Sequence, residues 1–270
     1  MLEITKMLVE AAGQAAEKLE QLGDSGRKYV KRGASGDLSL MGDVVSEDTI
    51  INYLKNSLDS FTVVTEEKGI LKIGKGKARD YFVIDPIDGS SNYKVGLAPY
   101  TVSIAVSNSR FMSGIYSGVV YEASSGKYFW AEKNNGAYFL NSRICRRESR
   151  KDSFIVSINF SHSNAGKMAS FLKNIFKKDV KIRAIGSASW EACLVAKGIL
   201  DAYVEAWNRL RVVDIAAALL VLRESGIPVI LDLENRDRDP ILDLKERVSF
   251  IASYSDKLLD EILSALKKEH

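Results

Sequence analysis

One acidic segment constrains this chain more than any other, because two aspartates and a Gly-Ser turn directly follow an apolar run. The run is Tyr81-Phe82-Val83-Ile84, and the next residues are Asp85-Pro86-Ile87-Asp88-Gly89-Ser90-Ser91-Asn92. Aromatic and β-branched residues predict a buried strand over residues 81–84. Carboxylate and carbonyl oxygens suit hard divalent cations, and backbone amides at a following helical turn suit phosphate. The segment therefore favours a metal and phosphate site, although Asp, Pro and Gly are also ordinary turn residues.

Two further acidic positions lie far from this segment in the sequence. Glu66 and Glu67 follow a β-rich run at residues 61–64, so they stand at a second predicted strand end. Asp214 stands at the head of an apolar, Ala-rich stretch, where the helix dipole stabilises a carboxylate. Taken alone, Asp214 is more simply explained as a helix cap. In combination, the three acidic positions favour a shared site.

The composition is that of a globular protein and excludes several classes. Of the 270 residues, 46% are hydrophobic and 27% charged, and no apolar segment has the length needed to span a bilayer. The formal net charge of +3 gives no broad electrostatic reason to expect nucleic-acid binding. Residues 1–6 include an acid and do not resemble the basic start of a signal peptide, so we expect a cytoplasmic location.

Two local basic clusters have simpler interpretations than nucleic-acid binding. Residues 143–151 include an acid and no aromatic residue, which is typical of a solvated connector. Residues 72–77 lack the spacing of a nucleotide-binding P-loop. Their position between two acidic segments predicts a mobile loop that closes over the phosphate as a lid.

Hydrophobic periodicity and turn residues predict a mixed α/β protein with interleaved helices and strands. Predicted helices cover residues 4–22, 43–58, 165–176, 187–197, 212–225 and 256–267. Predicted strands cover residues 61–64, 81–84, 101–107, 114–121, 154–158 and 202–205. A hairpin is predicted over residues 127–131 and 137–140, because Asn134-Asn135-Gly136 supplies the positive φ angles of a tight turn.

These residues resemble the inositol monophosphatase-like superfamily of metal-dependent phosphatases, which includes fructose-1,6-bisphosphatases and 3′-phosphoadenosine nucleotidases. The resemblance covers nearly the whole chain. It rests on Glu66-Glu67, Asp85-Pro86-Ile87-Asp88-Gly89-Ser90, Gly186-Ser187-Ala188 and Asp214-Ile215-Ala216-Ala217, in the order of the family. Residues 209–217 and 33–36 look most like the archaeal branch, whose members often hydrolyse both inositol 1-phosphate and fructose 1,6-bisphosphate.

The resemblance implies an α/β (mixed α+β) fold, the five-layer αβαβα sandwich of the sugar phosphatases. Residues 1–140 would form an N-terminal half with most metal ligands. Residues 141–270 would form a C-terminal half with Asp214 and the substrate-recognition residues, the two making one integrated catalytic unit. The resemblance also implies a homodimer.

The family's ligand pattern implies two Mg²⁺ ions, and a third at a further acid. One ion would be held by Glu66, Asp85 and the Ile87 carbonyl, and the other by Asp85, Asp88 and Asp214. The resemblance further implies that water, activated by metal and oriented by Glu66 and the Ser90 hydroxyl, attacks phosphorus directly. Asp43 resembles the acid that joins Ser90 in this step and contacts the third metal, but it is equally well explained as an N-terminal helix acid.

Phosphate and substrate contacts are implied in the same way. The backbone amides of Gly89 and Ser90, and the Ser91 hydroxyl, would receive the phosphate. Candidates for substrate binding are Asp88, Gly186, Ser187, Ala188, Glu205, Arg183 and Arg211, the two arginines for a second phosphate. Alternatives remain open: Ser187 is a good helix cap, Glu205 suits a solvated strand end, and either arginine suits a structural salt bridge.

The resulting expectation is a Mg²⁺-dependent phosphomonoesterase. Its substrate would be a small phosphorylated sugar or cyclitol, namely inositol 1-phosphate and also fructose 1,6-bisphosphate. One alternative is a 3′-phosphoadenosine nucleotide phosphatase. Another is a non-catalytic regulator that binds RNA or protein on the same fold.

Overall fold

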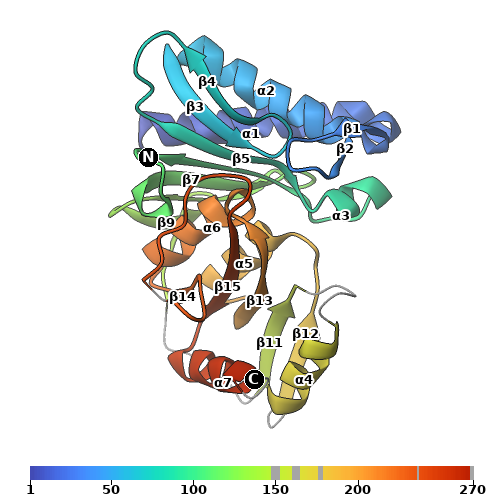
Figure 1. Ribbon diagram of the computed structural model, residues 1–270, viewed down its shortest axis with the longest axis vertical. Coiled ribbons are helices and arrows are strands. Elements are labelled where there is room, and N and C mark those ends of the chain that lie inside the picture. The colour runs from blue at the N-terminus through green and yellow to red at the C-terminus, as the bar shows by residue number, and fades with distance from the viewer. Residues whose placement is uncertain (147–152, 160–164, 176–178, 236, 268–270) are drawn as a thin grey trace.

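Helices and sheets alternate through the molecule in five layers (Figure 1). The computed structural model describes residues 1–146, 153–159, 165–175, 179–235 and 237–267. The longer helices are α1 (Glu3–Leu22), α2 (Met41–Ser57), α4 (Ala165–Ile175), α5 (Ala188–Ala196), α6 (Val212–Glu224) and α7 (Asp256–Lys267). The α1–α2 pair and the α4–α7 pair are the outer layers, and the α5–α6 pair lies between an eight-stranded and a five-stranded sheet. This αβαβα sandwich confirms the predicted fold.

Strands β3 to β10 form the eight-stranded sheet. Their bounds are Ser60–Thr65 (β3), Gly69–Gly74 (β4), Tyr81–Asp88 (β5), Thr101–Ser107 (β6), Ile115–Glu122 (β7), Lys127–Glu132 (β8), Gly136–Phe139 (β9) and Ser142–Ile144 (β10). The spatial order is β10-β9-β8-β7-β6-β5-β3-β4, in which β3 and β5 run parallel and the other neighbours antiparallel. The β8–β9 hairpin is as predicted, with Asn134 and Gly136 at positive φ.

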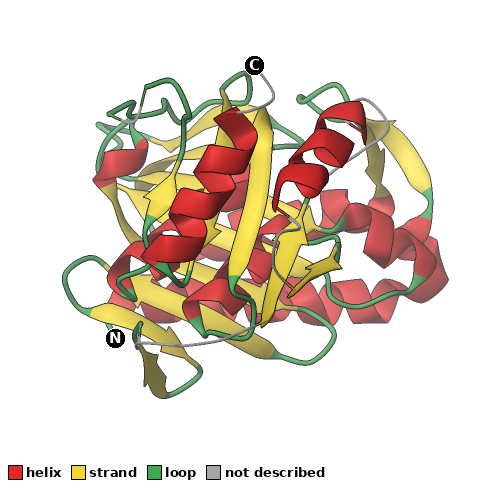
Figure 2. Ribbon diagram, turned by 90° about the horizontal axis from the view of Figure 1, so that it is seen from below, coloured by secondary structure: helices red, strands yellow, loops and turns green. Residues whose placement is uncertain are grey.

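The five-stranded sheet has the order β12-β11-β13-β15-β14. Its strands are β11 (Ser153–Ile158), β12 (Asp179–Arg183), β13 (Ala202–Arg211), β14 (Val229–Ile230) and β15 (Arg247–Ser253). The helices α4 and α7 lie on its outer face, as the view from that side shows (Figure 2). β13 is longer than predicted because it continues through an irregularity between Glu205 and Leu210 to the start of α6.

The central helix α6 fixes one edge of the candidate site. Residues 212–222 are all buried, since α6 packs between the two sheets and is apolar on every side. Small residues allow a close approach: a Cβ added at Gly118 of β7 would lie 3.1 Å from Ala217 Cα. This packing holds Asp214, in the first turn of α6, near the end of β5. Among the described residues, no helix combines the length and apolar character needed to cross a membrane.

A short hairpin of β1 (Tyr29–Arg32) and β2 (Leu38–Leu40) was not predicted, because its residues are few and mostly exposed. Its turn lies against the β3–β4 turn (Figure 1). The amides of Ala34 and Ser35 donate to the carbonyls of Glu67 and Glu66, each at 3.1 Å. The remaining short helices are η1 (Gly23–Arg27), α3 (Ser90–Val95) and η2 (Met112–Gly114).

The lid predicted at residues 72–77 is wrong. Lys72 to Gly74 belong to β4, an edge strand whose mostly exposed residues, bounded by glycines, gave a weak strand signal. Because β4 is antiparallel to β3, Gly74 pairs with Ser60, at the opposite end of β3 from Glu66. Residues 75–77 therefore follow at the far edge and do not reach the acidic segment. In the predicted connector, residues 147–151 lie outside the described residues.

Candidate active site

The acidic segments meet at a cavity of about 340 Å³ between the ends of β5, the β3–β4 turn, α5 and the β13–α6 junction. Its wall contains most of the residues predicted for the site, from segments far apart in sequence. They are Glu66, Asp85, Ile87, Asp88, Gly89, Ser90, Ser91, Gly186, Ala188, Arg211 and Asp214. Ser187 lies buried behind this wall, and Asp43, Glu205 and Arg183 are not part of it.

A β-bulge brings the two aspartates of β5 to this cavity. In the pairing with β6, Asp85 stands opposite Ser103 and Asp88 opposite Thr101, so three steps along β5 match two along β6. Residues three apart on a regular strand face opposite sides of the sheet, and one extra residue corrects this. Asp85 Oδ1 accepts the Ile87 amide at 3.1 Å. The bulge is therefore the local reason why the segment places both carboxylates in one site.

Asp88 is held by the start of α5. The Ser187 hydroxyl, the Ser189 hydroxyl and the Ser189 amide donate to Oδ2 at 2.7, 2.6 and 2.7 Å. The Ala188 amide donates to Oδ1 at 3.0 Å. Asp88 thus links the end of β5 to the Gly186-Ser187-Ala188 turn. The Ser187 hydroxyl is bound to this carboxylate.

Gly89 and Ser90 form the turn that follows β5. Gly89 has φ +96°, and a Cβ there would lie 3.0 Å from the Gly186 carbonyl oxygen, so glycine permits both the left-handed conformation and the close approach. The Ser90 hydroxyl donates to the Ile87 carbonyl at 2.8 Å and lies 3.3 Å from Asp43 Oδ1. The turn therefore connects the β5 acids to the start of α2.

Asp43 is a buried acid in the first turn of α2. Its Oδ2 accepts the Leu40 amide at 2.7 Å and so caps the helix. This contact agrees with the interpretation of Asp43 as an N-terminal helix acid. Its second oxygen faces Ser90, so the same carboxylate also reaches the turn beside the cavity. Burial raises the pKa of Asp43 to about 7, against the lowering effect of the Leu40 hydrogen bond.

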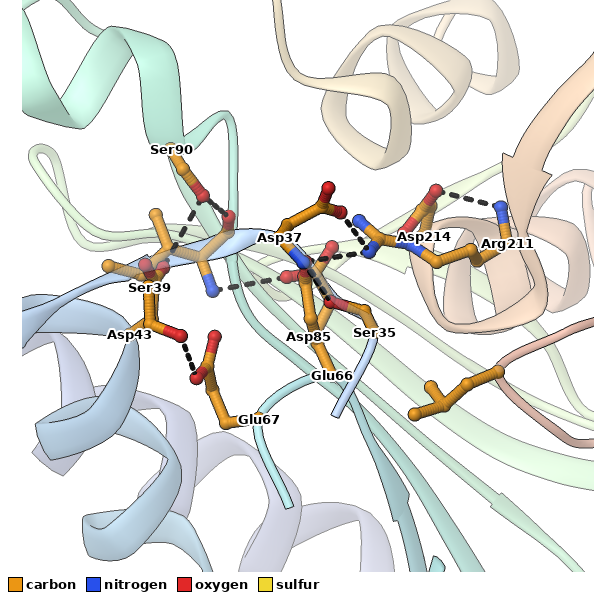
Figure 3. A network of polar contacts seen from close by, with 12 residues as sticks. Ser35, Asp37, Ser39, Asp43, Glu66, Glu67, Asp85, Ser90, Arg211 and Asp214 are labelled. Carbon is orange, nitrogen blue, oxygen red and sulfur yellow. Dashed lines mark hydrogen bonds and ion pairs between the residues drawn. The ribbon is translucent and has the colours of Figure 1, made fainter. Parts of the chain in front are cut away.

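Arg211 lies among the acids on the opposite side of the cavity (Figure 3). Its Nη1 donates to Glu66 Oε1 at 2.6 Å and to Asp37 Oδ2 at 3.1 Å. Its Nε lies 3.2 Å from Asp214 Oδ1, and its backbone amide donates to Asp214 Oδ2 at 2.8 Å. Arg211 therefore forms the salt bridges that were one of its two expected uses.

Several carboxyl groups of the cavity have raised pKa values. Burial raises the pKa of Glu66 to about 7, although Arg211 opposes the shift. Burial, with repulsion from Asp88, Glu66 and Asp214, raises the pKa of Asp85 well above its ordinary value. Burial also raises the pKa of Asp88, against the hydrogen bonds from α5. Arg211 is the only basic side chain among the described residues that line the cavity.

The donor set fits a hard divalent cation, because it consists of carboxylate and carbonyl oxygens that repel one another when no cation is present. In the described part of the chain, no three acidic, histidine or cysteine side chains form a ready-made metal cage. The contacts give the reason: Glu66 and Asp214 are engaged by Arg211, and Asp88 is engaged by α5. Metal binding would require these side chains to exchange partners.

Six residues of the cavity wall were not predicted as site residues: the apolar Ile158, Ala184 and Leu210, and the polar Asn159, Glu191 and Tyr203. Glu191 accepts the amides of Gly186 and Ile185 at 2.8 and 3.2 Å, so it shapes the turn that holds Asp88. An acid in the first turn of a helix after a glycine turn was the available signal for Glu191. Tyr203 is fully buried in β13 and gave no signal beyond an ordinary strand pattern.

Glu205 and Arg183 lie apart from the cavity wall. Glu205 is fully buried and accepts the amides of Trp207 and Arg209 at 3.0 and 3.3 Å. These hydrogen bonds provide acceptors for backbone amides in the irregular part of β13. The interpretation of Glu205 as a solvated strand end is therefore wrong, because the strand continues and covers it. Arg183 is exposed at the end of β12, where its guanidinium donates to the Ile182 carbonyl at 2.9 Å.

Comparison with known proteins identifies the family. The model of the inositol monophosphatase family matches residues 1–270. A fructose-1,6-bisphosphatase/inositol-1-monophosphatase of Methanothermobacter thermautotrophicus is 28% identical over 96% of this chain and 94% of its own. A Nus factor SuhB of Pasteurella multocida is 31% identical over 84% of this chain and 83% of its own. The chain belongs to the inositol monophosphatase family, which confirms the predicted family and the assignment as a phosphoric monoester hydrolase.

Solved structures agree with this assignment. The crystal structure of an inositol monophosphatase–fructose 1,6-bisphosphatase superimposes with a TM-score of 0.82, at 27% identity, over 98% of this chain and 100% of the other. An extragenic suppressor protein suhB from Bartonella henselae gives the same TM-score and identity over 99% of each chain.

The buried acids predict how the stability of the metal-free protein depends on pH. The pKa values of Asp43, Glu66, Glu191 and Glu205 are each raised to about 7, so the folded state binds more protons than the unfolded state between roughly pH 4.5 and 7. The stabilisation is complete below the unfolded values and is lost as the pH rises through 7. We expect the Tm in EDTA to be higher at pH 5.5 than at pH 7.5. Thermal unfolding across this range checks it, and a Tm that rises with pH would contradict it.

Proposed function

We propose that this protein is a Mg²⁺-dependent phosphomonoesterase that hydrolyses inositol 1-phosphate and fructose 1,6-bisphosphate. One observation carries the proposal: Glu66, Asp85, Asp88 and Asp214, from three distant segments, line a single cavity with a Gly-Ser turn. Family membership and the names of the archaeal relatives support the choice of substrates.

The proposal assigns two Mg²⁺ ions to the carboxylates of Glu66, Asp85, Asp88 and Asp214 and the Ile87 carbonyl. A third Mg²⁺ would bind near Asp43. When bound, Mg²⁺ would neutralise the carboxylates, polarise a phosphoryl oxygen and lower the pKa of water. Asp85 supports the assignment most directly, because it is buried and its pKa is raised by burial and by repulsion from Asp88, Glu66 and Asp214.

Ser90 and Asp43 would orient the attacking water with Glu66. Support comes from the chain of contacts in which the Ser90 hydroxyl lies between the Ile87 carbonyl and Asp43 Oδ1. Asp43, with its pKa raised to about 7, would hold or release a proton near neutral pH. The amides of Gly89 and Ser90 and the Ser91 hydroxyl, all on the cavity wall, would bind the phosphate.

Substrate recognition would involve the part of the cavity wall formed by Asp88, Gly186 and Ala188, where Gly186 packs against Gly89 of the phosphate turn. Ser187 would act through Asp88, to which it donates. For Glu205 the proposal retains only an indirect role, because it is buried behind the wall. The second phosphate of a bisphosphate would meet Arg211 or, after movement of β12, Arg183.

Homodimer formation and a cytoplasmic location are part of the same proposal. So is a division into two halves near Leu140. This position directly precedes β10, which still pairs with β9 of the first sheet.

The test is phosphate release by the purified protein, with and without Mg²⁺, from four substrates. These are inositol 1-phosphate, fructose 1,6-bisphosphate, 3′-phosphoadenosine 5′-phosphate and NADP. NADP is included because this chain is similar to a bifunctional NADP phosphatase/NAD kinase of Methanococcus maripaludis. The two are 30% identical over 85% of this chain and 43% of the other. We expect Mg²⁺-dependent release, fastest from inositol 1-phosphate. Faster release from either nucleotide would reject the substrate assignment, and no release from any substrate would favour a non-catalytic regulator.

A further inference from the structure

Arg211 occupies an unusual place for a permanently charged side chain. It is the last residue of β13, its side chain is only 17% exposed, and it lies within the acidic cavity. Its guanidinium joins three segments: Glu66 of the β3–β4 turn, Asp214 of α6 and Asp37 of the β1–β2 turn (Figure 3). No other basic side chain is found among the described residues of the cavity wall.

The oxygens that Arg211 holds are oxygens that the proposed metal site needs. Nη1 lies 2.6 Å from Glu66 Oε1, and Nε lies 3.2 Å from Asp214 Oδ1. A divalent cation bound by either carboxylate would meet the guanidinium at close range, where two positive charges repel strongly in a buried site. An arginine cannot relieve this repulsion by losing its proton, so its side chain must move.

The structure also offers a place to which the guanidinium can move. Asp37 Oδ2 lies 3.1 Å from Nη1, and the Asp37 side chain is 72% exposed on the hairpin turn. Arg211 can thus keep one ionic partner on the exposed β1–β2 turn while it releases the two inner carboxylates. The contact with Asp37 is already made in this structure, so the movement required is short.

We propose that Arg211 is an internal counter-ion that occupies the cation position of the metal-free site and must give up Glu66 and Asp214 when Mg²⁺ binds. Arg211 therefore stabilises the metal-free protein and weakens its affinity for Mg²⁺. The inference rests on the proposed metal site and adds a residue that sets the affinity of that site.

The experiment measures Mg²⁺ binding by titration calorimetry and thermal unfolding, at pH 7.5, with no substrate present. It compares the wild type with Arg211→Met, which keeps an unbranched side chain without the charge, and Arg211→Lys, which keeps a charge that cannot span two carboxylates. Arg110→Met is the matched control, since Arg110 is exposed and absent from the cavity wall.

We expect Arg211→Met to bind Mg²⁺ about a hundredfold more tightly than the wild type, because two charge-assisted hydrogen bonds, to Glu66 and to Asp214, no longer have to be broken on binding and each is equivalent to roughly tenfold. Its Tm should be lower than that of the wild type in EDTA and should approach it at saturating Mg²⁺. Arg211→Lys should have an intermediate affinity, and Arg110→Met should match the wild type.

The outcomes separate the inference from the proposed function. If both Arg211 variants bind Mg²⁺ with wild-type or weaker affinity, Arg211 is only a structural ion pair and the inference is overturned. If Arg211→Met does not fold, the affinity of Arg211→Lys decides in the same way. If the wild type itself shows neither binding heat nor a Tm shift with Mg²⁺, the metal site and the proposed function are overturned with it.

Discussion

Replacing Asp85 with asparagine should greatly slow phosphate release and yet raise the heat stability of the metal-free protein. Asp85 is buried, and repulsion from Asp88, Glu66 and Asp214 adds to the cost of its charge, as its raised pKa reflects. Asparagine has nearly the same shape and keeps an oxygen that can accept the Ile87 amide. The substitution removes the repulsion with little change in packing, but it also removes the carboxylate that would be shared between two metal ions.

The expected loss of rate is on the order of a thousandfold, the scale seen when a central electrostatic group of an active site is removed. The expected rise in Tm in EDTA is roughly 2–4 °C for each kcal/mol of repulsion relieved. Phosphate release from inositol 1-phosphate and thermal unfolding measure the two effects on the same preparation. Asp24→Asn removes a carboxylate that is 93% exposed and should change neither quantity. A variant that keeps its activity, or that loses stability in EDTA, would contradict the role given to Asp85.

The sequence predicted the part of the site that is contiguous. Asp85, Asp88 and Gly89 lie within one short segment, so their chemistry could be recognised before any fold was known. The bulge that turns both carboxylates to one side could not be foreseen, because it depends on pairing with β6. The position of Asp214 was harder to predict. Its role as a helix cap is a local feature, but its place beside Glu66 results from the packing of α6 between two sheets.

Interactions between distant segments account for what was missed. The contact of Arg211 with Asp214 spans three positions and is readable from sequence, whereas its contact with Glu66 spans 145. Edge strands gave weak signals as well. β12 alternates charged with apolar residues and was overlooked, and β4 is short, mostly exposed and bounded by glycines, so its second half was taken for a loop. Glu205 looked like the end of a strand because the β-rich pattern stops there, while the backbone continues to Arg211.

Replacing Asp88 with alanine should have the opposite effect on stability from the change at Asp85, only three positions away. Asp88 accepts four hydrogen bonds from the start of α5, two from hydroxyls and two from backbone amides. Alanine would leave the two backbone amides buried without their acceptor, while the two hydroxyls would retain only the Thr101 hydroxyl as a partner. We expect this loss to outweigh the relief of repulsion from the nearby carboxylates. We expect the free energy of unfolding to fall by about 3–5 kcal/mol, in the upper range for a single substitution.

Urea unfolding in EDTA at pH 7.5 measures this effect, with Asp88→Asn as the graded comparison. Asparagine keeps one oxygen for the donors grouped on Oδ2 but turns its amide toward the Ala188 amide, so its loss should be smaller than that of alanine. The two aspartates would then be distinguished by the direction of the change in the free energy of unfolding. The charge of Asp85 destabilises the metal-free fold, whereas Asp88 stabilises it by holding α5 to β5. A stabilised Asp88→Ala protein would show that the contacts with α5 contribute less than the repulsion within the cavity.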